Sequence, residues 1–421
     1  MPQPKPLLLL TISLCLSVSL SPCTLATASY SGKPLVTAVT KDPATSLYTS
    51  PLKDSRPLVL DLSGPLIWST CERSHPTLEC HHHECAHAHS FHPPNCPHSG
   101  YGVADEEDRF RCKCTAHPYN PFTGKSARGD LTRVRLSANA TDGKNPLYPV
   151  SFSAVASCAP ASLLAKLPAG AAGVAGLANT RLALPAQVAR TQKVSKKFVL
   201  CLPRTGDGVA IFGGGPFFLL SPSQLGDLTS TLTYTQFLIK KNNPAYHLPV
   251  KGIAVNKAQV QFPGHALANG GIVLGTRVPY TELRSDVYRP LVDAFDKALG
   301  RDDAKVPAVA PFELCYDSNK LGPTRIGFLV PDIVLMLEGG KNWTFSGSNS
   351  MVDVDNFRKA CFAFVEMKAE KGGYGGAPAV VIGGFQMENH VLQFDLEKQQ
   401  LGFAKLLFFT SCGNFNFTRS L

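Results

Sequence analysis

Residues 58–71 read LVLDLSGPLIWSTC, and this stretch decides the fold of the chain. An apolar run leads into the turn at residues 61–64, Asp-Leu-Ser-Gly, and a second apolar run follows and ends on tryptophan and cysteine. Short apolar runs on both sides of a glycine-containing turn predict a strand, a tight turn and a second strand. Asp61 at this turn is therefore the first candidate for chemistry.

Two segments in the second half of the chain show the same strand-and-turn pattern. Residues 270–277 read GGIVLGTR, and residues 379–389 read AVVIGGFQMEN. Between them, apolar residues at positions 287, 288, 291, 292 and 295 have helical spacing, and Ser285 precedes them as a candidate N-cap. The pattern predicts buried strands, glycine turns and one amphipathic helix.

In this order and at this spacing, the segments resemble the plant pepsin-like aspartic proteases over nearly the whole chain. The resemblance implies an all-β, bilobal pepsin-like aspartic protease fold with a few short helices. A signal peptide is expected at residues 1–28, an N-terminal lobe at 29–232 and a C-terminal lobe at 233–421. The 421 residues, 44% of them hydrophobic, suffice for two cores.

The catalytic pair of that family is incomplete in this chain. Each lobe of an active member supplies an Asp-Thr/Ser-Gly turn, and the two carboxylates share one proton around a water. Asp61 matches the first aspartate, whereas Gly275 falls on the second and Arg277 on the glycine of the second turn. We therefore expect no peptidase activity, with Asp61 as a relic, and no cofactor.

Further segments are similar to the TAXI-type cereal xylanase inhibitors, which are related to carrot dermal glycoprotein and to legume basic 7S globulins. The matching segments are residues 34–42 (PLVTAVTKD), 173–179 (GVAGLAN), 209–216 (VAIFGGGP) and 349–354 (NSMVDV). The resemblance implies a plant defence protein that inhibits a microbial endo-1,4-β-xylanase or a related glycoside hydrolase. The alternative is a non-inhibitory cell-wall or seed storage-like binding protein of the same fold.

In these inhibitors, loops of the second lobe enter a cleft that is lined by two carboxylates. The resemblance assigns one target-binding role to Leu321, after Cys-Tyr-Asp, and another to position 408, just before Phe-Thr-x-Cys. The family has a histidine there, but this chain has Phe408. Phenylalanine cannot donate a hydrogen bond to a carboxylate, although it can fill a sugar subsite. The identity of the target hydrolase, if there is one, stays open.

The first residues indicate secretion to the apoplast or cell wall. Lys5 precedes an apolar run at residues 7–20, and residues 26–28, Ala-Thr-Ala, offer a cleavage site. No later apolar run is long enough to span a membrane. Three glycosylation sequons begin at Asn139, Asn342 and Asn416.

Eleven of the thirteen cysteines lie beyond the signal peptide, and an oxidising compartment favours disulfides. The resemblance implies a bond within the second lobe between Cys315 and Cys361. We also expect Cys201 and Cys412 to tie the lobes together, and Cys71 to pair with Cys158. Pairing within the remaining cluster is open, and the odd number leaves one thiol over. The cluster consists of Cys80, Cys85, Cys96, Cys112 and Cys114.

Residues 80–89 read CHHHECAHAH, a composition that is typical of metal sites. Because oxidation removes the thiolates, we interpret the segment as a stapled surface loop and expect no metal site. The formal net charge of +10 favours acidic partners or anionic polysaccharide. Nucleic acid is disfavoured, since the basic residues are dispersed and the chain is expected to be secreted. We expect a monomer.

Overall fold

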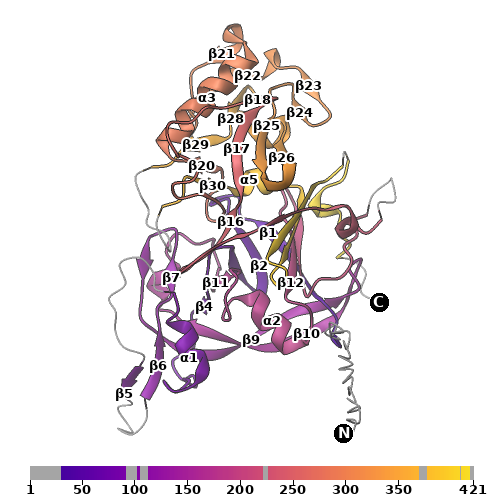
Figure 1. The fold of residues 1–421 in the computed structure, drawn as a ribbon. Helices are drawn as coiled ribbons and strands as arrows, with labels where there is room; N and C mark the ends of the chain where they lie inside the picture. The colour runs from indigo at the N-terminus through magenta and orange to yellow at the C-terminus, as the bar shows by residue number, and fades with distance from the viewer. Residues whose placement is uncertain are drawn as a thin grey trace, which may run out of the picture. The chain divides into compact units, whose positions relative to one another are not determined.

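Strands dominate the regular structure of this protein, and the expected all-β, bilobal pepsin-like class is confirmed (Figure 1). The computed structural model describes residues 30–91, 102–104, 112–220, 226–368, 377–407 and 409–417. Residues Ser31–Leu421 form one unit. Within the described ranges, no helix combines the length and apolarity needed to cross a bilayer.

Fourteen of the described strands form one large, mostly antiparallel sheet. In spatial order, the strands are β14 (Thr233–Gln236), β32 (Gln400–Lys405), β31 (His390–Asp395), β12 (Lys197–Cys201), β13 (Asp207–Phe212), β1 (Leu35–Lys41), β2 (Tyr48–Lys53), β3 (Arg56–Asp61), β11 (Gly173–Gly176), β4 (Ile67–Ser69), β10 (Pro146–Cys158), β9 (Gly129–Thr141), β6 (Cys112–Ala116) and β5 (Gly102–Ala104). The sheet crosses the lobe boundary expected at residues 232 and 233, because β14, β31 and β32 extend it beyond β12.

Smaller sheets build the second half of the chain. One has the order β15 (Leu238–Lys240), β16 (Asn243–Leu248), β19 (Ile272–Leu274), β30 (Val380–Ile382), β20 (Thr281–Leu283) and β29 (Phe364–Glu366). Another contains β18 (Ala258–Gln259), β17 (Val250–Val255), β25 (Ile333–Leu337) and β26 (Asn342–Phe345). A third contains β21 (Lys305–Val306), β22 (Cys315–Asp317), β28 (Lys359–Phe362) and β27 (Met351–Val354).

Two hairpins pair β7 (Tyr119–Asn120) with β8 (Lys125–Ser126), and β23 (Pro323–Thr324) with β24 (Gly327–Phe328).

The described helices are short, except for α3 (Ser285–Leu299). Val287, Tyr288, Leu291 and Phe295 are buried on one face of α3, as the apolar spacing predicts. The N-cap is Arg284 rather than Ser285, because Ser285 already has helical geometry, so the predicted cap was one residue too late. The other helices are α1 (His83–Ala88), α2 (Leu184–Gln192), α4 (Gly347–Ser350) and α5 (Gly384–Met387).

The described cysteines form five disulfides. Cys71 is bonded to Cys158, Cys201 to Cys412, and Cys315 to Cys361. In the cluster whose pairing the sequence left open, Cys80 is bonded to Cys112 and Cys85 to Cys114. Cys96 lies outside the described residues.

Candidate functional site

Two turns face each other where the halves of the chain meet. Asp61 ends β3, which pairs in parallel with β11, and Gly275 follows β19, which pairs in parallel with β30. Thr276 joins the turns: its Oγ1 donates a 2.7 Å hydrogen bond to the Leu60 carbonyl and accepts a 3.2 Å bond from the Leu62 amide. The turn at residue 275 is therefore docked directly against the turn that carries Asp61.

Asp61 is only 4% exposed, and its nearest charged partner is a cation. The Ser63 amide donates to Asp61 Oδ1 at 2.9 Å, and Arg277 Nε lies 3.4 Å from the same oxygen. Residue 275 is a glycine, and a Cβ there would lie 2.7 Å from Cγ1 of Val381. The guanidinium therefore places a positive charge beside the Asp61 carboxylate, which favours its ionised form.

The hairpin β7–β8 covers this region and is firmly anchored. Asn120 is fully buried, and its Nδ2 donates to the carbonyls of Leu163 and Ala165 at 2.7 and 2.9 Å. Tyr119 is buried, and its carbonyl accepts a 3.0 Å bond from Trp68 Nε1. Burial raises the pKa of the Tyr119 hydroxyl. These contacts show that Tyr119 is packed into the protein interior.

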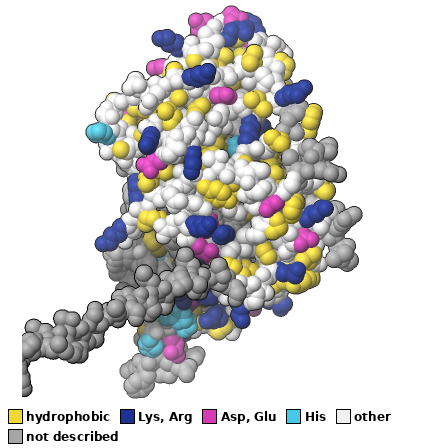
Figure 2. Space-filling model, turned by 45° about the vertical axis from the view of Figure 1, so that its right-hand side comes forward, with side chains coloured by type: hydrophobic (Ala, Val, Ile, Leu, Met, Phe, Trp, Pro, Cys, Tyr) yellow, Lys and Arg dark blue, Asp and Glu magenta, His cyan; other side chains and the backbone are white. Residues whose placement is uncertain are grey.

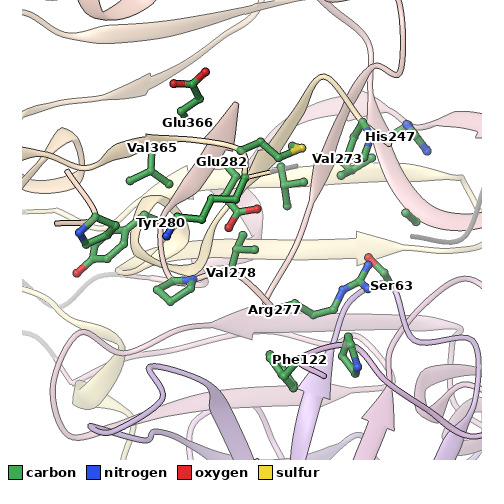
Figure 3. A pocket seen from close by; sticks show the side chains of 18 of the residues that line it. Ser63, Phe122, His247, Val273, Arg277, Val278, Tyr280, Glu282, Val365 and Glu366 are labelled. Atoms are coloured by element: carbon green, nitrogen blue, oxygen red, sulfur yellow. The ribbon is translucent and has the colours of Figure 1, made fainter. Parts of the chain in front are cut away.

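A cavity of about 420 Å³ opens beside Arg277 and receives side chains from both halves of the chain. Ser63 and Phe122 come from the first half of the chain, whereas most of the wall comes from the second half, from strands β16, β19, β20, β29 and β30 and from loops near them. In Figure 3 the Arg277 side chain extends toward Ser63, and Phe122 lies below it in the view. The cavity has the size of a small-molecule site.

Two polar side chains of the cavity wall are fixed by sheet register. His247 pairs with Val273 on β16 and β19, and both residues line the cavity. Glu282 on β20 pairs with Val365 of β29 and with Val381 of β30, and all three line the cavity. Because residues in register share one face of a sheet, His247 and Glu282 both face the cavity.

His247 is only 2% exposed, and neither ring nitrogen has a hydrogen-bond partner among the described residues. Burial and the nearby Lys240 lower the pKa of His247 to about 4, so the ring is neutral at ordinary pH. Glu366 also lines the cavity but is ion-paired with Arg289, which in turn binds Glu313.

A second buried acid, Glu388, was not identified from the sequence. It is fully buried, and its Oε1 accepts hydrogen bonds from Lys41 Nζ at 2.6 Å and from the Tyr48 hydroxyl at 2.8 Å. Arg204 Nε lies 3.1 Å from Oε2. Burial, and secondly Glu388, raise the Tyr48 pKa well above its usual range. A fully buried carboxylate that binds three residues of the first half serves to hold the halves of the chain together.

The residues predicted to bind a target are placed unfavourably or lie outside the described residues. Leu321 is 4% exposed and belongs to the main hydrophobic core, because the chain turns inward after the short helix at Ser318–Lys320. Its side chain is therefore not presented at the surface, contrary to expectation. Phe408 lies outside the described residues.

Unlike Leu321, apolar side chains at the neighbouring hairpin β23–β24 are exposed. Ile326 is 48% exposed and Leu329 67%, and Arg325 at the turn is also exposed. Gly327 has φ of +100°, and a Cβ there would lie 2.1 Å from the Ser348 amide, so glycine lets the hairpin lie against α4. This short polar turn carries only a weak sequence signal.

The hairpin lies close to the C-terminal segment. The Ser348 amide donates to the Ile326 carbonyl at 2.7 Å, and Lys405 Nζ donates to Ser348 Oγ at 3.0 Å. Just beyond Lys405, Leu407 is 60% exposed and Phe409 81%. We name Arg325, Ile326, Leu329, Leu407 and Phe409 the hairpin surface. On the face in Figure 2, Lys and Arg side chains are scattered among hydrophobic ones.

The cysteine and histidine cluster has the composition of a metal site but not its chemistry. Two groups bring sulfur and imidazole together, namely Cys80, His81 and Cys112, and Cys85, His89 and Cys114. All four sulfurs are in disulfides, so they are not thiolate ligands. Of the three sequon residues, Asn342 is exposed, while Asn139 and Asn416 are half-buried.

Comparison with known proteins identifies the family. The model of the xylanase inhibitor N-terminal domain matches residues 46–214, and that of the C-terminal domain matches residues 245–405. Chitinase CLP of Oryza sativa subsp. japonica is 62% identical over 98% of both chains. Gamma conglutin 1 of Prunus dulcis is 33% identical over 92% of this chain and 90% of its own.

The likeness extends to a solved structure. The crystal structure of edgp superposes with a TM-score of 0.81 at 31% identity, covering 93% of this chain and all of that one. Since the two domain models together match most of the chain, this protein belongs to the TAXI-type xylanase inhibitor family of aspartic protease-like proteins.

Proposed function

We propose that this protein is secreted, has no peptidase activity, and binds and inhibits a microbial glycoside hydrolase through the hairpin surface. The observation that carries the proposal is the exposed turn at Arg325 and Ile326, docked against α4 beside the C-terminal segment. Membership of the xylanase inhibitor family supports the class of partner.

The chemistry of the hairpin surface suits such a target. Glycoside hydrolases present an open cleft with two carboxylates. A guanidinium at a hairpin tip can form a bidentate bond with a carboxylate, and Ile326 and Leu329 can fill neighbouring sugar subsites. Phe409, in the left-handed region with φ of 66°, adds an exposed aromatic ring on the C-terminal segment.

The absence of peptidase activity rests on the paired turns. Gly275 supplies no carboxylate opposite Asp61, and Arg277 lies beside that acid. A lone carboxylate that is neutralised by a cation does not activate a water for peptide cleavage. Pepstatin-sensitive cleavage of a denatured protein substrate would contradict this part of the proposal.

The test of inhibition is direct. Purified protein is incubated at micromolar concentration with microbial xylanases and related endoglucanases, and residual hydrolase activity is measured. We expect the wild-type protein to inhibit at least one enzyme. Arg325→Gln should weaken this inhibition about tenfold or more, because a few residues, often arginines, supply most of the binding energy of an interface. The exposed Arg128 provides the matched control, Arg128→Gln. No inhibition across the panel would favour the storage-like binding protein.

One observation favours a second function. The rice relative at 62% identity is named a chitinase, which points to activity on chitin. Glycosidases require acidic side chains, and Glu282 faces the cavity. Release of reducing ends from chitin oligomers, lost on Glu282→Gln, would support this function. No release by the wild-type protein would exclude it.

A further inference from the structure

A basic face on the long hairpin β9–β10 takes no part in the proposed inhibition. The two strands have 13 residues each and pair in antiparallel register (Figure 1). Arg133 and Arg135 alternate with buried residues along β9, so both guanidinium groups lie on its exposed side. Together with Ser151 and Ser153 of β10, they line a hollow of about 490 Å³.

The two guanidinium groups are available to a ligand. Within the part of the chain that the structure describes, neither forms an ion pair, and their one hydrogen bond runs from Arg135 Nη2 to Ser151 Oγ at 3.2 Å. By contrast, the exposed Arg289 binds Glu313 at 2.6 Å. Because an arginine carries five N–H donors, most donors of Arg133 and Arg135 remain open.

These donors select an acidic ligand with several carboxylates. A guanidinium forms paired, charge-assisted hydrogen bonds with a carboxylate. Residues two positions apart on a strand are separated by about 6.6 Å, so Arg133 and Arg135 can bind successive carboxylates of one molecule. The hydroxyls of Ser151 and Ser153 beside them can bind neutral hydroxyl groups. Acidic sugars present both kinds of group.

The openness of the face to solvent favours a polymer over a single sugar. Charge pairs at an exposed surface are individually weak. A polymer presents many carboxylates, and each bound group holds the next one at high effective concentration. The formal net charge of +10 attracts the same kind of partner from a distance.

We infer that the face formed by Arg133, Arg135, Ser151 and Ser153 binds an acidic polysaccharide whose sugars carry carboxylates. Strand register places Ser153 opposite Arg135, so a hydroxyl and a guanidinium lie side by side on this face. Single-stranded nucleic acid fits less well, because it binds by stacking its bases on aromatic rings. The aromatic residue that lines the hollow, Phe152, is only 6% exposed.

Two double variants test the inference in the full mature protein. Binding of polygalacturonate is measured by isothermal titration calorimetry, with the fully methyl-esterified polymer as the neutral form of the same chain. Arg133→Gln/Arg135→Gln removes both guanidinium groups. Lys251→Gln/Lys257→Gln removes two charges from exposed positions on and just after β17 and is the matched control.

We expect polygalacturonate to bind and its methyl ester to bind at least tenfold more weakly. The arginine double variant should weaken binding about tenfold or more, since hydrogen bonds between charged groups are stronger than neutral ones. The lysine double variant should change it much less. High salt should also weaken binding, because it screens exposed charges. Thermal unfolding checks that both variants are folded.

Four results would overturn the inference: no binding of polygalacturonate, equal binding of the methyl ester, equal losses in the two double variants, or equal binding of double-stranded DNA. The last result would indicate a general attraction to polyanions. Inhibition through the hairpin surface is a separate readout, because Arg325 is not among the residues that line the hollow. Arg325→Gln should therefore bind polygalacturonate as the wild-type protein does.

Discussion

Asp61 and Glu388 are both buried where the halves of this chain meet, and their surroundings differ. Asp61 ends β3 at the turn that was predicted as a catalytic relic, and its ionic partner is one guanidinium at 3.4 Å. Glu388 has no counterpart in the catalytic pattern, yet Lys41, Tyr48 and Arg204 all bind it. The comparison shows that Glu388, which the sequence did not single out, has more partners than Asp61, the acid for which a relic role was predicted.

The strongest way to break this comparison is to remove Glu388. Glu388→Ala leaves Lys41 and Arg204 without their buried counter-charge, so we expect a loss of about 3–5 kcal/mol in the free energy of unfolding. Urea denaturation of wild type and variant measures the loss. The exposed Glu338→Ala serves as control. A loss below about 1 kcal/mol would show that the cluster is not stabilising.

The buried His390, next to Glu388, should make the stability of the protein depend on pH. Its Nδ1 lies 3.0 Å from the Glu388 carbonyl, and burial lowers its pKa to about 4, against an ordinary 6.5. The unfolded chain therefore binds the proton first as pH falls. The stability linked to this neutral ring is complete above pH 6.5 and is lost as pH falls through 4.

We expect His390 to contribute on the order of 3 kcal/mol across this range. Urea denaturation at several pH values should give a flatter profile for His390→Phe than for wild type, whereas the exposed His265→Phe should keep the wild-type slope. The Glu388 carbonyl retains its bond from Asn349 in the variant. Parallel profiles for wild type and His390→Phe would contradict the assignment.

Thr276 tests the junction of the two turns at a smaller scale. Thr276→Val leaves the Leu62 amide and the Leu60 carbonyl without the hydroxyl that joins them. Unsatisfied buried polar groups cost about 1–3 kcal/mol, which is the expected loss in unfolding free energy. Thr233→Val, at an exposed position, should be nearly neutral. Equal stability of both variants would mean that the turns are held by other contacts.

The smallest effect is expected at the acid itself. Asp61→Asn keeps an oxygen for the Ser63 amide and removes only the ion pair with the partly exposed Arg277. We expect a change of about 1 kcal/mol or less, with unchanged hydrolase inhibition. A large loss of inhibition would show that Asp61 participates in function, and the contrast with Glu388 would then fail.

The class of the fold and the position of its turns could be predicted from sequence because their signals are local. Residues 58–64 and 270–277 each combine an apolar run with a short turn. The contact of Thr276 with Leu60 joins residues more than two hundred positions apart, so no local pattern predicts it. Glu388 was missed for the same reason, since its three partners lie far away in sequence.

Surface loops were harder to predict than the frame. The resemblance assigned a target-binding role to Leu321, but the side chain packs into the core, because burial depends on how the following hairpin folds back. The exposed Arg325 and Ile326 are a few residues further along. Loop tips differ between members of a fold, so roles transfer less reliably there than core positions do.

The Cys201–Cys412 disulfide has a consequence for how the protein responds to proteolysis. The two cysteines are 211 positions apart in sequence, and β12 also pairs with β31 across the same span. Hydrolysis of any single peptide bond between these cysteines would leave two polypeptides that are joined by the disulfide and by the β12–β31 pairing. Such clipped material would migrate as one species in electrophoresis until a thiol reagent separated the pieces.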